Sequence, residues 1–271
     1  MRRSTGWLGE RGSDSPRLDA ELLLAHVLGT ERLQLYLDPA RKPAAAEVDA
    51  YRALVRRRGA GEPVAHLTGK KEFYGLEFEV TTDVLVPRPE TELLVDRARA
   101  LGGARLLDVG TGSGCVAIAC AVRLPEARVT ATDVSQAALE VAQRNAERHG
   151  VAERIDFRQG DLFAPVDAMD TSARFDLILS NPPYVATGET VETAGKEPDV
   201  ALFAGPQGTE ILERLLDAAP EHLAPGGTLL MEIGEDQAGF VEGRARASFG
   251  SVTIHADLAG LPRMLEASSP P

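Results

Sequence analysis

From residue 104 onward, apolar segments with strand character alternate with segments of helical pattern. The segments that predict strands are 104–109, 127–133, 154–159, 175–180, 227–233 and 251–258. The segments that predict helices lie between them, at roughly 113–123, 135–149, 208–223 and 235–248. This alternation is typical of an α/β domain whose mostly parallel sheet is covered by helices on both faces. Ligands of such sheets bind at the carboxyl ends of the strands, so we expect the functional site there.

The part of the chain before this alternation has a different pattern. Residues 1–71 predict a small helical domain, residues 72–86 a β-hairpin linker, and the larger domain then covers residues 87–271. Two stripes of apolar residues at helical spacing are expected to be buried in the helical domain: Leu18, Leu22, Ala25 and Leu28 in one helix, and Val48, Tyr51 and Val55 in another. No cluster of chemically active residues stands out in this domain, so we interpret it first as a helical cap.

The composition argues against several kinds of partner and site. The net charge is −12, and a negative field repels phosphates, so we expect no nucleic acid partner. No apolar run is long enough to span a membrane, and the five histidines are scattered, so we expect neither a membrane anchor nor a metal site. Cys115 and Cys120 fall on different faces of one predicted helix. We therefore expect no disulfide and a reducing, cytoplasmic compartment.

The turns after the first three strands of the larger domain are candidates for binding a nucleoside. Gly110, Gly112 and Gly114 form a GxGxG turn between a strand and a helix, where backbone can approach a ligand closely. Asp133 ends the second strand, where a carboxylate can accept both hydroxyls of a ribose; the alternative is that it caps the next helix. After the third strand, Asp161 is placed to meet an adenine amino group. Leu162 is placed to pack on the ring, although an ordinary polar turn explains Leu162 equally well.

The fourth strand ends in Asn181-Pro182-Pro183-Tyr184. Two prolines end any strand, so the simplest interpretation is a strand terminator. The locked prolines also stiffen the turn, so that the Asn181 side-chain oxygen and the Pro182 carbonyl can accept hydrogen bonds from one planar NH2 group. Tyr184 would then pack on the flat face of that group. We interpret these four residues as catalytic and substrate-binding, because preorganised acceptors can hold a nitrogen lone pair toward an incoming methyl group.

These motifs together resemble the class I S-adenosylmethionine methyltransferases that act on a planar nitrogen. Residues 56–96, which contain "PVAHLTGKKEFYGLEFEV" and "PRPETE", are similar to the protein-(glutamine-N5) methyltransferases of peptide chain release factors, the PrmC/HemK family. The segments "LDVGTGSG", "KEPDVALFAGPQG" and "DLAGLPR" also correspond, so that the resemblance covers about residues 18 to 263. "PRPETE" is the segment that separates this family from other enzymes with an NPPY motif.

The resemblance implies a Rossmann-like class I methyltransferase domain with a mostly parallel seven-stranded sheet, preceded by a helical substrate-recognition domain. It implies S-adenosylmethionine as the cofactor, S-adenosylhomocysteine as the product, and no metal. The implied cofactor-binding residues are Gly110, Thr111, Gly112, Ser113, Gly114, Asp133, Asp161, Leu162 and Asn181. The implied substrate-binding residues are Pro89, Glu90, Thr91, Asn181, Pro182, Pro183 and Tyr184.

The activity implied by the resemblance is methyl transfer to N5 of the glutamine in the Gly-Gly-Gln motif of release factors, which would be the protein partners. One alternative is an N-methyltransferase acting on an exocyclic base amine of DNA or rRNA, against which the acidic charge counts. A dinucleotide-dependent oxidoreductase is another, but the GxGxG spacing and the NPPY turn count against it. A non-catalytic nucleotide-sensing or assembly protein would leave the NPPY turn unexplained.

Overall fold

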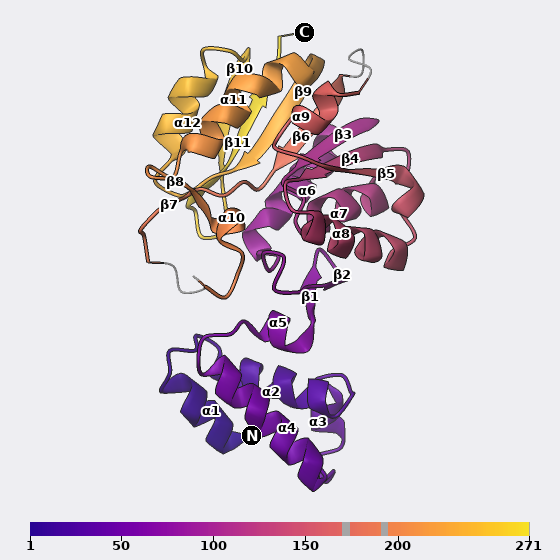
Figure 1. Ribbon diagram of the computed structural model, residues 1–271, viewed down its shortest axis with the longest axis vertical. Helices are drawn as coiled ribbons and strands as arrows, with labels where there is room; N and C mark the ends of the chain where they lie inside the picture. Colours follow the sequence, from indigo (N-terminus) through magenta and orange to yellow (C-terminus); the bar gives the residue numbers. More distant parts are fainter. Residues whose placement is uncertain (170–173, 191–194, 271) are drawn as a thin grey trace. The chain divides into compact units, whose positions relative to one another are not determined.

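The computed structural model describes residues 1–169, 174–190 and 195–270. The chain divides into two compact units. The first holds Met1–Lys70 and the described residues Gly195 and Lys196, and the second holds Lys71–Thr190 and the described residues from Glu197 onward (Figure 1). Nowhere in these described stretches is a helix both long and apolar enough to cross a membrane.

The first unit consists of helices only. They are α1 (Arg2–Gly9), α2 (Pro16–Val27), α3 (Gln34–Leu37), α4 (Ala45–Arg58) and α5 (Val64–Thr68). Their apolar faces pack into one core made of Leu8, Ala20, Leu23, Tyr51, Val55 and Leu67. Burial of Tyr51 and Val55 on α4 agrees with the stripe expected from the sequence.

The buried face of α2 differs from the stripe that the sequence predicts. Ala20 and Leu23 are fully buried, whereas Leu18 is 37% exposed. The reason is that Glu21 is also fully buried on this face, and its charge is satisfied by hydrogen-bond donors. The donors to Glu21 are Arg17, Arg32 and Tyr36. A pattern that counts only apolar residues misses a helix face that includes a paired carboxylate.

The second unit begins with a hairpin of β1 (Lys70–Phe73) and β2 (Leu76–Glu79). Tyr74 and Gly75, the two residues of the turn, both have positive φ, which matches the right-handed twist of a two-residue hairpin. Phe73 and Phe78 are buried in a core of this unit. Part of the segment expected as a linker, 72–86, is thus packed within the second unit.

A seven-stranded sheet forms the centre of the second unit, in the order β10-β11-β9-β6-β3-β4-β5. Its strands are β3 (Arg105–Val109), β4 (Arg128–Asp133), β5 (Ile155–Gln159), β6 (Phe175–Ser180), β9 (Leu223–Glu232), β10 (Ser251–Ala256) and β11 (Pro262–Ser268). Only β11 runs against its neighbours. The mostly parallel α/β sheet is therefore confirmed. The pattern of alternating strands and helices did not reveal β11, because it follows β10 in a hairpin with no helix between them.

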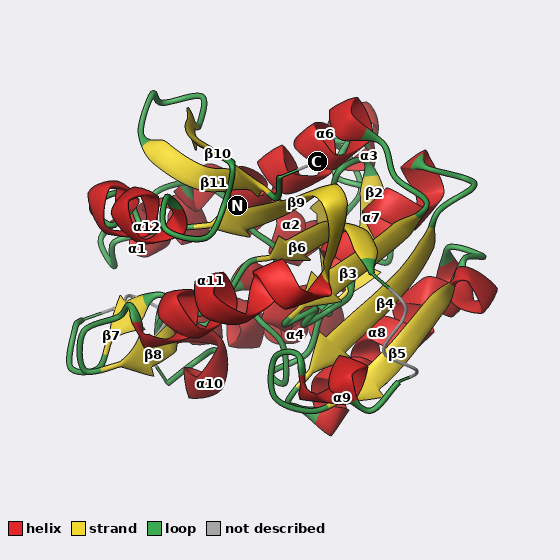
Figure 2. Ribbon diagram, turned by 90° about the horizontal axis from the view of Figure 1, so that it is seen from above, coloured by secondary structure: helices red, strands yellow, loops and turns green. Residues whose placement is uncertain are grey.

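Helices cover both faces of this sheet. They are α6 (Glu92–Leu101), α7 (Cys115–Arg123), α8 (Gln136–Arg148), α9 (Ala164–Asp167), α10 (Asp199–Leu202), α11 (Glu210–His222) and α12 (Ala238–Ala245). Successive strand residues belong to different cores: Leu106 packs in the core with α6, α7 and α8, and Leu107 in the core with α11 and α12. In Figure 2, α7 and α11 lie on opposite sides of the strands. Burial on both faces explains why the central strands β3 and β6 are largely apolar.

Short elements complete the second unit. A single 3₁₀ turn, η1 (Pro89–Thr91), precedes α6, and η2 (Ala152–Arg154) precedes β5. The strands β7 (Val185–Ala186) and β8 (Phe203–Gly205) pair with each other after the NPPY turn.

Candidate active site

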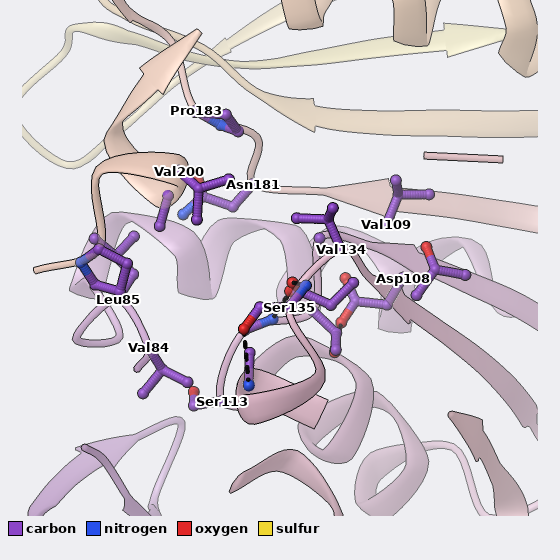
Figure 3. Close-up of a pocket in the computed structure, with 18 of the residues that line it drawn as sticks. Val84, Leu85, Asp108, Val109, Ser113, Val134, Ser135, Asn181, Pro183 and Val200 are labelled. Carbon is purple, nitrogen blue, oxygen red and sulfur yellow. Dashed lines mark hydrogen bonds between the residues drawn. The ribbon is translucent and has the colours of Figure 1, made fainter. Parts of the chain in front are cut away.

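A pocket lies at the carboxyl ends of β3, β4 and β6, where the sequence predicted a site (Figure 3). The sequence-predicted residues that line it are Thr91, Gly110, Thr111, Gly112, Ser113, Asp133, Asp161, Leu162, Asn181 and Pro183. Gly114, Pro182, Tyr184, Pro89 and Glu90 are outside this lining. In the close-up, Asn181, Pro183 and Val200 lie together on one side of the pocket, with Ser113, Ser135 and Asp108 across from them.

The glycines of the GxGxG turn have two different uses. Gly110 and Gly112 have positive φ and line the pocket with backbone, and a Cβ at either one would meet no other atom within 4 Å. Gly114 faces the protein instead, because a Cβ there would lie 2.9 Å from Ile118 and 3.0 Å from Ala142. Gly114 is therefore required for packing of α7 against α8, and the other two keep the backbone accessible to a ligand.

Asp133 is held in place by backbone donors at the end of β4. Its Oδ2 accepts from Gly112 N at 2.8 Å and its Oδ1 from Ser135 N at 2.9 Å. Burial raises the pKa of this carboxyl, although the backbone hydrogen bonds act in the opposite direction. Ser135 caps α8 by accepting from Ala138 N at 3.2 Å, so the cap is supplied by Ser135 and Asp133 orders the turn. Each Asp133 oxygen keeps a second lone pair with which a ligand hydroxyl can bond.

Asp161 and Leu162 lie at the rim of the pocket. Asp161 is exposed and accepts from Arg214, on α11, at 2.5 Å. Leu162 has a φ of 47°, a conformation that is uncommon for a residue with a side chain, and its carbonyl accepts from Thr132 Oγ1 at 3.2 Å. The turn that carries both residues is thus fixed by contacts with neighbouring segments.

Asp108 is a buried pocket residue that the sequence analysis missed. Its Oδ2 accepts from Thr111 Oγ1 at 2.7 Å and from Ala117 N at 3.1 Å. Among the described residues, none donates to Oδ1. Burial raises the pKa of Asp108 to about 6, and the nearby charge of Asp133 adds to the rise. Asp108 is thus an acidic group at the wall of the pocket with one oxygen left for a cationic ligand.

Asn181 is oriented by a hydrogen bond from its own side chain. Its Nδ2 donates to Thr91 Oγ1 at 3.0 Å. No described residue donates to its Oδ1, and Asn181 lines the pocket. The amide oxygen is therefore available to accept a hydrogen bond from a substrate, which is the role predicted for it.

The other end of the NPPY turn is held by the last residue of β9 and by a residue that follows this strand. Tyr184 O–H donates to Glu232 Oε1 at 3.3 Å, and the Tyr184 carbonyl accepts from Gln237 Nε2 at 2.9 Å. Burial, followed by the adjacent Glu232, raises the pKa of Tyr184 to about 12, so this phenol stays protonated at neutral pH. Tyr184 is held at both its side chain and its backbone.

A buried ion pair holds the segment before α6 next to the pocket. Glu197 is 4% exposed; its Oε2 accepts from Arg88 at 2.5 Å and its Oε1 from Val86 N at 2.8 Å. Arg88 and Pro87 line the pocket, whereas Pro89 and Glu90 do not. Glu197 therefore connects the "PRPETE" and "KEPD" segments, which are more than 100 residues apart in sequence.

Two residues at the site that sequence reasoning missed share one signal. Asp108 and Glu232 are single carboxylates within the apolar runs "LLDV" and "LLMEI", and such a charge is retained in a buried strand only where it has partners. Arg88, which donates to Glu197, and Gln237, which donates to the Tyr184 carbonyl, carry no such signal. No group of three or more histidine, cysteine or carboxylate residues suited to a metal ion is found in the described part of the chain.

Comparison with known proteins identifies the family. Residues 1–69 match the PrmC N-terminal domain and residues 89–197 match the methyltransferase small domain. A release factor glutamine methyltransferase of Chlorobaculum tepidum is 44% identical, over 98% of this chain and 94% of that protein. A second, from Rhodopirellula baltica, is 43% identical over 97% and 92%.

Solved structures support the fold of the second unit. A methyltransferase from Pyrococcus furiosus matches with a TM-score of 0.56 at 23% identity, covering 81% of this chain and 98% of that one. A T. thermophilus 16S rRNA methyltransferase in complex with AdoMet and guanosine matches with a TM-score of 0.52 at 20% identity, covering 74% and 49%. The fold is that of class I methyltransferases, and by its full-length relatives the chain belongs to the family of release factor glutamine methyltransferases.

Proposed function

We propose that this protein transfers a methyl group from S-adenosylmethionine to N5 of the glutamine in the Gly-Gly-Gln motif of peptide chain release factors. The observation that carries the proposal is the Asn181 amide. Its nitrogen donates to Thr91, and no described residue donates to its oxygen. Because Asn181 lines the pocket, this oxygen can accept a hydrogen bond from a planar NH2 group. The relatives reported above are named release factor glutamine methyltransferases, which supports this substrate class.

The residues of the pocket fit S-adenosylmethionine. Asp133 would accept hydrogen bonds from the ribose hydroxyls, and the backbone of Gly110 and Gly112 would lie against the ligand. Asp108, with one oxygen that no described residue bonds, would face the cationic amino acid part of the cofactor. Asp161 and Leu162 would border the adenine. When bound, the cofactor supplies a methyl group on a sulfonium, so the protein need not provide a nucleophile.

In this proposal the turn Asn181–Tyr184 holds the substrate amide. The two hydrogens of the glutamine NH2 group would be donated to Asn181 Oδ1 and the Pro182 carbonyl, which turns the nitrogen lone pair toward the methyl group. The new nitrogen–carbon bond would replace the sulfur–carbon bond of the cofactor, which would leave S-adenosylhomocysteine, and the substrate nitrogen would then lose one proton to water. Tyr184 stays a neutral phenol throughout and would pack against the amide.

The enzyme would recognise more of its protein partner than the glutamine that it methylates. The helical unit, Met1–Lys70, has its own core, and we assign it the recognition of release factor surface beyond the Gly-Gly-Gln loop. The net charge of −12 disfavours a nucleic acid substrate. Since release factors act in translation, the site of action would be the cytoplasm.

The test is methyl transfer from labelled S-adenosylmethionine to a purified full-length release factor, beside DNA and rRNA. We expect label only in the release factor, and none when the glutamine of its Gly-Gly-Gln motif is replaced by alanine. A short peptide with the motif should be a poor substrate, because it lacks the surface read by the helical unit. Methylation of DNA or rRNA with none of the release factor would overturn the substrate assignment.

A further inference from the structure

Three distant segments of the second unit meet at one buried carboxylate. Glu232, the last residue of β9, is 2% exposed. Its Oε2 accepts from Thr91 Oγ1 at 2.7 Å, and its Oε1 accepts from Tyr184 O–H at 3.3 Å. Thr91, 1% exposed, in turn accepts from Asn181 Nδ2 at 3.0 Å. Glu232 does not line the pocket, so it acts on the site through other residues.

The direction of these hydrogen bonds follows from the number of protons available. An ionised carboxylate only accepts, so Thr91 and Tyr184 must both donate to Glu232. The Thr91 hydroxyl has one proton, which is given to Glu232, so toward Asn181 it can only accept. The Asn181 side chain must then turn its NH2 group toward Thr91. Its oxygen is left on the other side, where it is available to the pocket.

We propose that Glu232 is a positioning residue, which fixes the orientation of the Asn181 amide through the Thr91 hydroxyl. This inference rests on the proposed function, because a glutamine NH2 group needs the oxygen of Asn181, not its nitrogen. If Thr91 were free to donate to Asn181, the amide could turn over and present NH2 to the substrate NH2, two donors that cannot bond. The carboxylate of Glu232 removes that alternative.

The surroundings of Glu232 bear on its ionisation. Burial raises its pKa, and the negative charge of Glu90 adds to the rise; the hydrogen bonds from Thr91 and Tyr184 and the positive charge of Arg263 act in the opposite direction. Protonated Glu232 could donate to Thr91 and so release the orientation of Asn181. We therefore expect kcat to fall as the pH falls through the raised pKa of Glu232.

The variants that test the network are Glu232→Gln, Thr91→Val and the double variant. Glutamine has one acceptor oxygen for two donating hydroxyls, so one of Thr91 and Tyr184 must reverse. Thr91→Val keeps the shape of the side chain but removes the hydroxyl. Thr91→Ser is the matched control, because it keeps the hydroxyl and removes only a methyl group. Loss of one orienting hydrogen bond is expected to lower kcat about tenfold.

We expect Glu232→Gln and Thr91→Val each to lower kcat about tenfold, with the affinity for S-adenosylmethionine changed less than about twofold. Because both act through one hydroxyl, the double variant should be no slower than the slower single one. Thr91→Ser should keep kcat within about twofold of wild type, since its hydroxyl can still relay the orientation. Independent, multiplied losses, or Thr91→Ser as slow as Thr91→Val, would overturn the proposal.

A second measurement does not depend on the methyl acceptor. The side-chain NH2 of Asn181, assigned by its loss in Asn181→Ala, should exchange slowly with water in the wild type when followed by NMR. In Glu232→Gln and Thr91→Val this exchange should be faster. Unchanged exchange in both variants would refute the positioning role. If wild-type enzyme fails to methylate a release factor while the exchange changes as expected, the proposed substrate is wrong and the network stands.

Discussion

Replacing Asp108 by asparagine is expected to make the ligand-free protein more stable and to lower its affinity for S-adenosylmethionine. Both donors to Asp108, Thr111 Oγ1 and Ala117 N, bond the same oxygen, Oδ2. An asparagine can place its amide oxygen there and keep both hydrogen bonds. What the substitution removes is the buried charge.

The magnitude follows from the pKa of Asp108. Burial, with a smaller contribution from Asp133, raises it from 3.8 to about 6. Between these values the folded chain binds more protons than the unfolded chain, so the free energy of unfolding falls as the pH rises from about 4 to about 6. Above that range the destabilisation is fully present, and at about 1.4 kcal/mol for each pKa unit it amounts to about 3 kcal/mol. The free energy of unfolding of Asp108→Asn should exceed that of wild type by up to this amount at pH 8 and by almost nothing at pH 4.

The assay is urea unfolding of the ligand-free chain at pH 4 and pH 8, together with calorimetric titration of S-adenosylmethionine. Trp7 is the single tryptophan and lies in the first unit, so its fluorescence follows the helices, whereas circular dichroism also follows the sheet. The gain at pH 8 should be seen by circular dichroism. Cofactor affinity should fall at least tenfold, because a charged hydrogen bond is worth about 1.5–3 kcal/mol.

The matched control is Asp161→Asn, which removes the same formal charge from the exposed rim of the pocket. Its ion pair with Arg214 is solvent-exposed, so stability should change by less than about 1 kcal/mol at either pH. The reasoning fails if Asp108→Asn is no more stable than wild type at pH 8. The assignment of Asp108 to the cofactor fails if the variant binds S-adenosylmethionine as tightly as wild type.

Three further substitutions test other residues. Asp133→Ala should weaken S-adenosylmethionine binding at least tenfold by calorimetry, through loss of a charged hydrogen bond; unchanged affinity in a folded variant would contradict the ribose assignment. Asn181→Ala should lower kcat on the order of 10²–10³-fold with cofactor affinity nearly unchanged, and wild-type turnover would mean that the NPPY turn only ends a strand. Despite burial, hydrogen bonds from Tyr36, Arg17 and Arg32 hold the pKa of Glu21 at about 2. The lowered pKa of Glu21 contributes stability that is present above about pH 4.5 and is lost as the pH falls toward 2. Glu21→Gln should therefore destabilise the helical unit at pH 7 by about 2 kcal/mol, after allowance for the exposed arginines. An unchanged Trp7 fluorescence transition would contradict that.

The sequence predicted the sheet well where a single local pattern decides the structure. The central strands β3 and β6 are largely apolar runs because both faces of the sheet are covered there, and such runs are visible without any tertiary information. β11 was missed by the alternation because no helix separates it from β10; it also starts at a proline and contains Arg263 and Glu266, so it is no continuous apolar run. Its position next to β9 depends on pairing across the sheet.

The site was predictable to the extent that its residues lie in turns at strand ends. Asp133 and Asn181 were found this way, and both line the pocket. The bonds that orient them were not predictable, because Thr91 and Glu232 are 141 residues apart in sequence and meet only in the fold. Distance in sequence also hid the pairing of Arg88 with Glu197.

The hydrogen-bond donors of two buried carboxylates at strand ends distinguish a residue that positions other side chains from a residue that binds a ligand. Glu232 has one hydroxyl donor on each oxygen, so its bonding within the protein is complete without a ligand. Asp108 receives both donors on Oδ2 and keeps Oδ1 for the pocket. A ligand stabilises the folded state by an amount that depends on its affinity. At a given concentration of S-adenosylmethionine, this stabilisation therefore differs from wild type only in a variant whose affinity for the cofactor has changed. The cofactor should therefore raise the unfolding temperature of Glu232→Gln as much as that of wild type, and that of Asp108→Asn much less. Equal shifts in all three proteins would show that Asp108, like Glu232, serves only the protein.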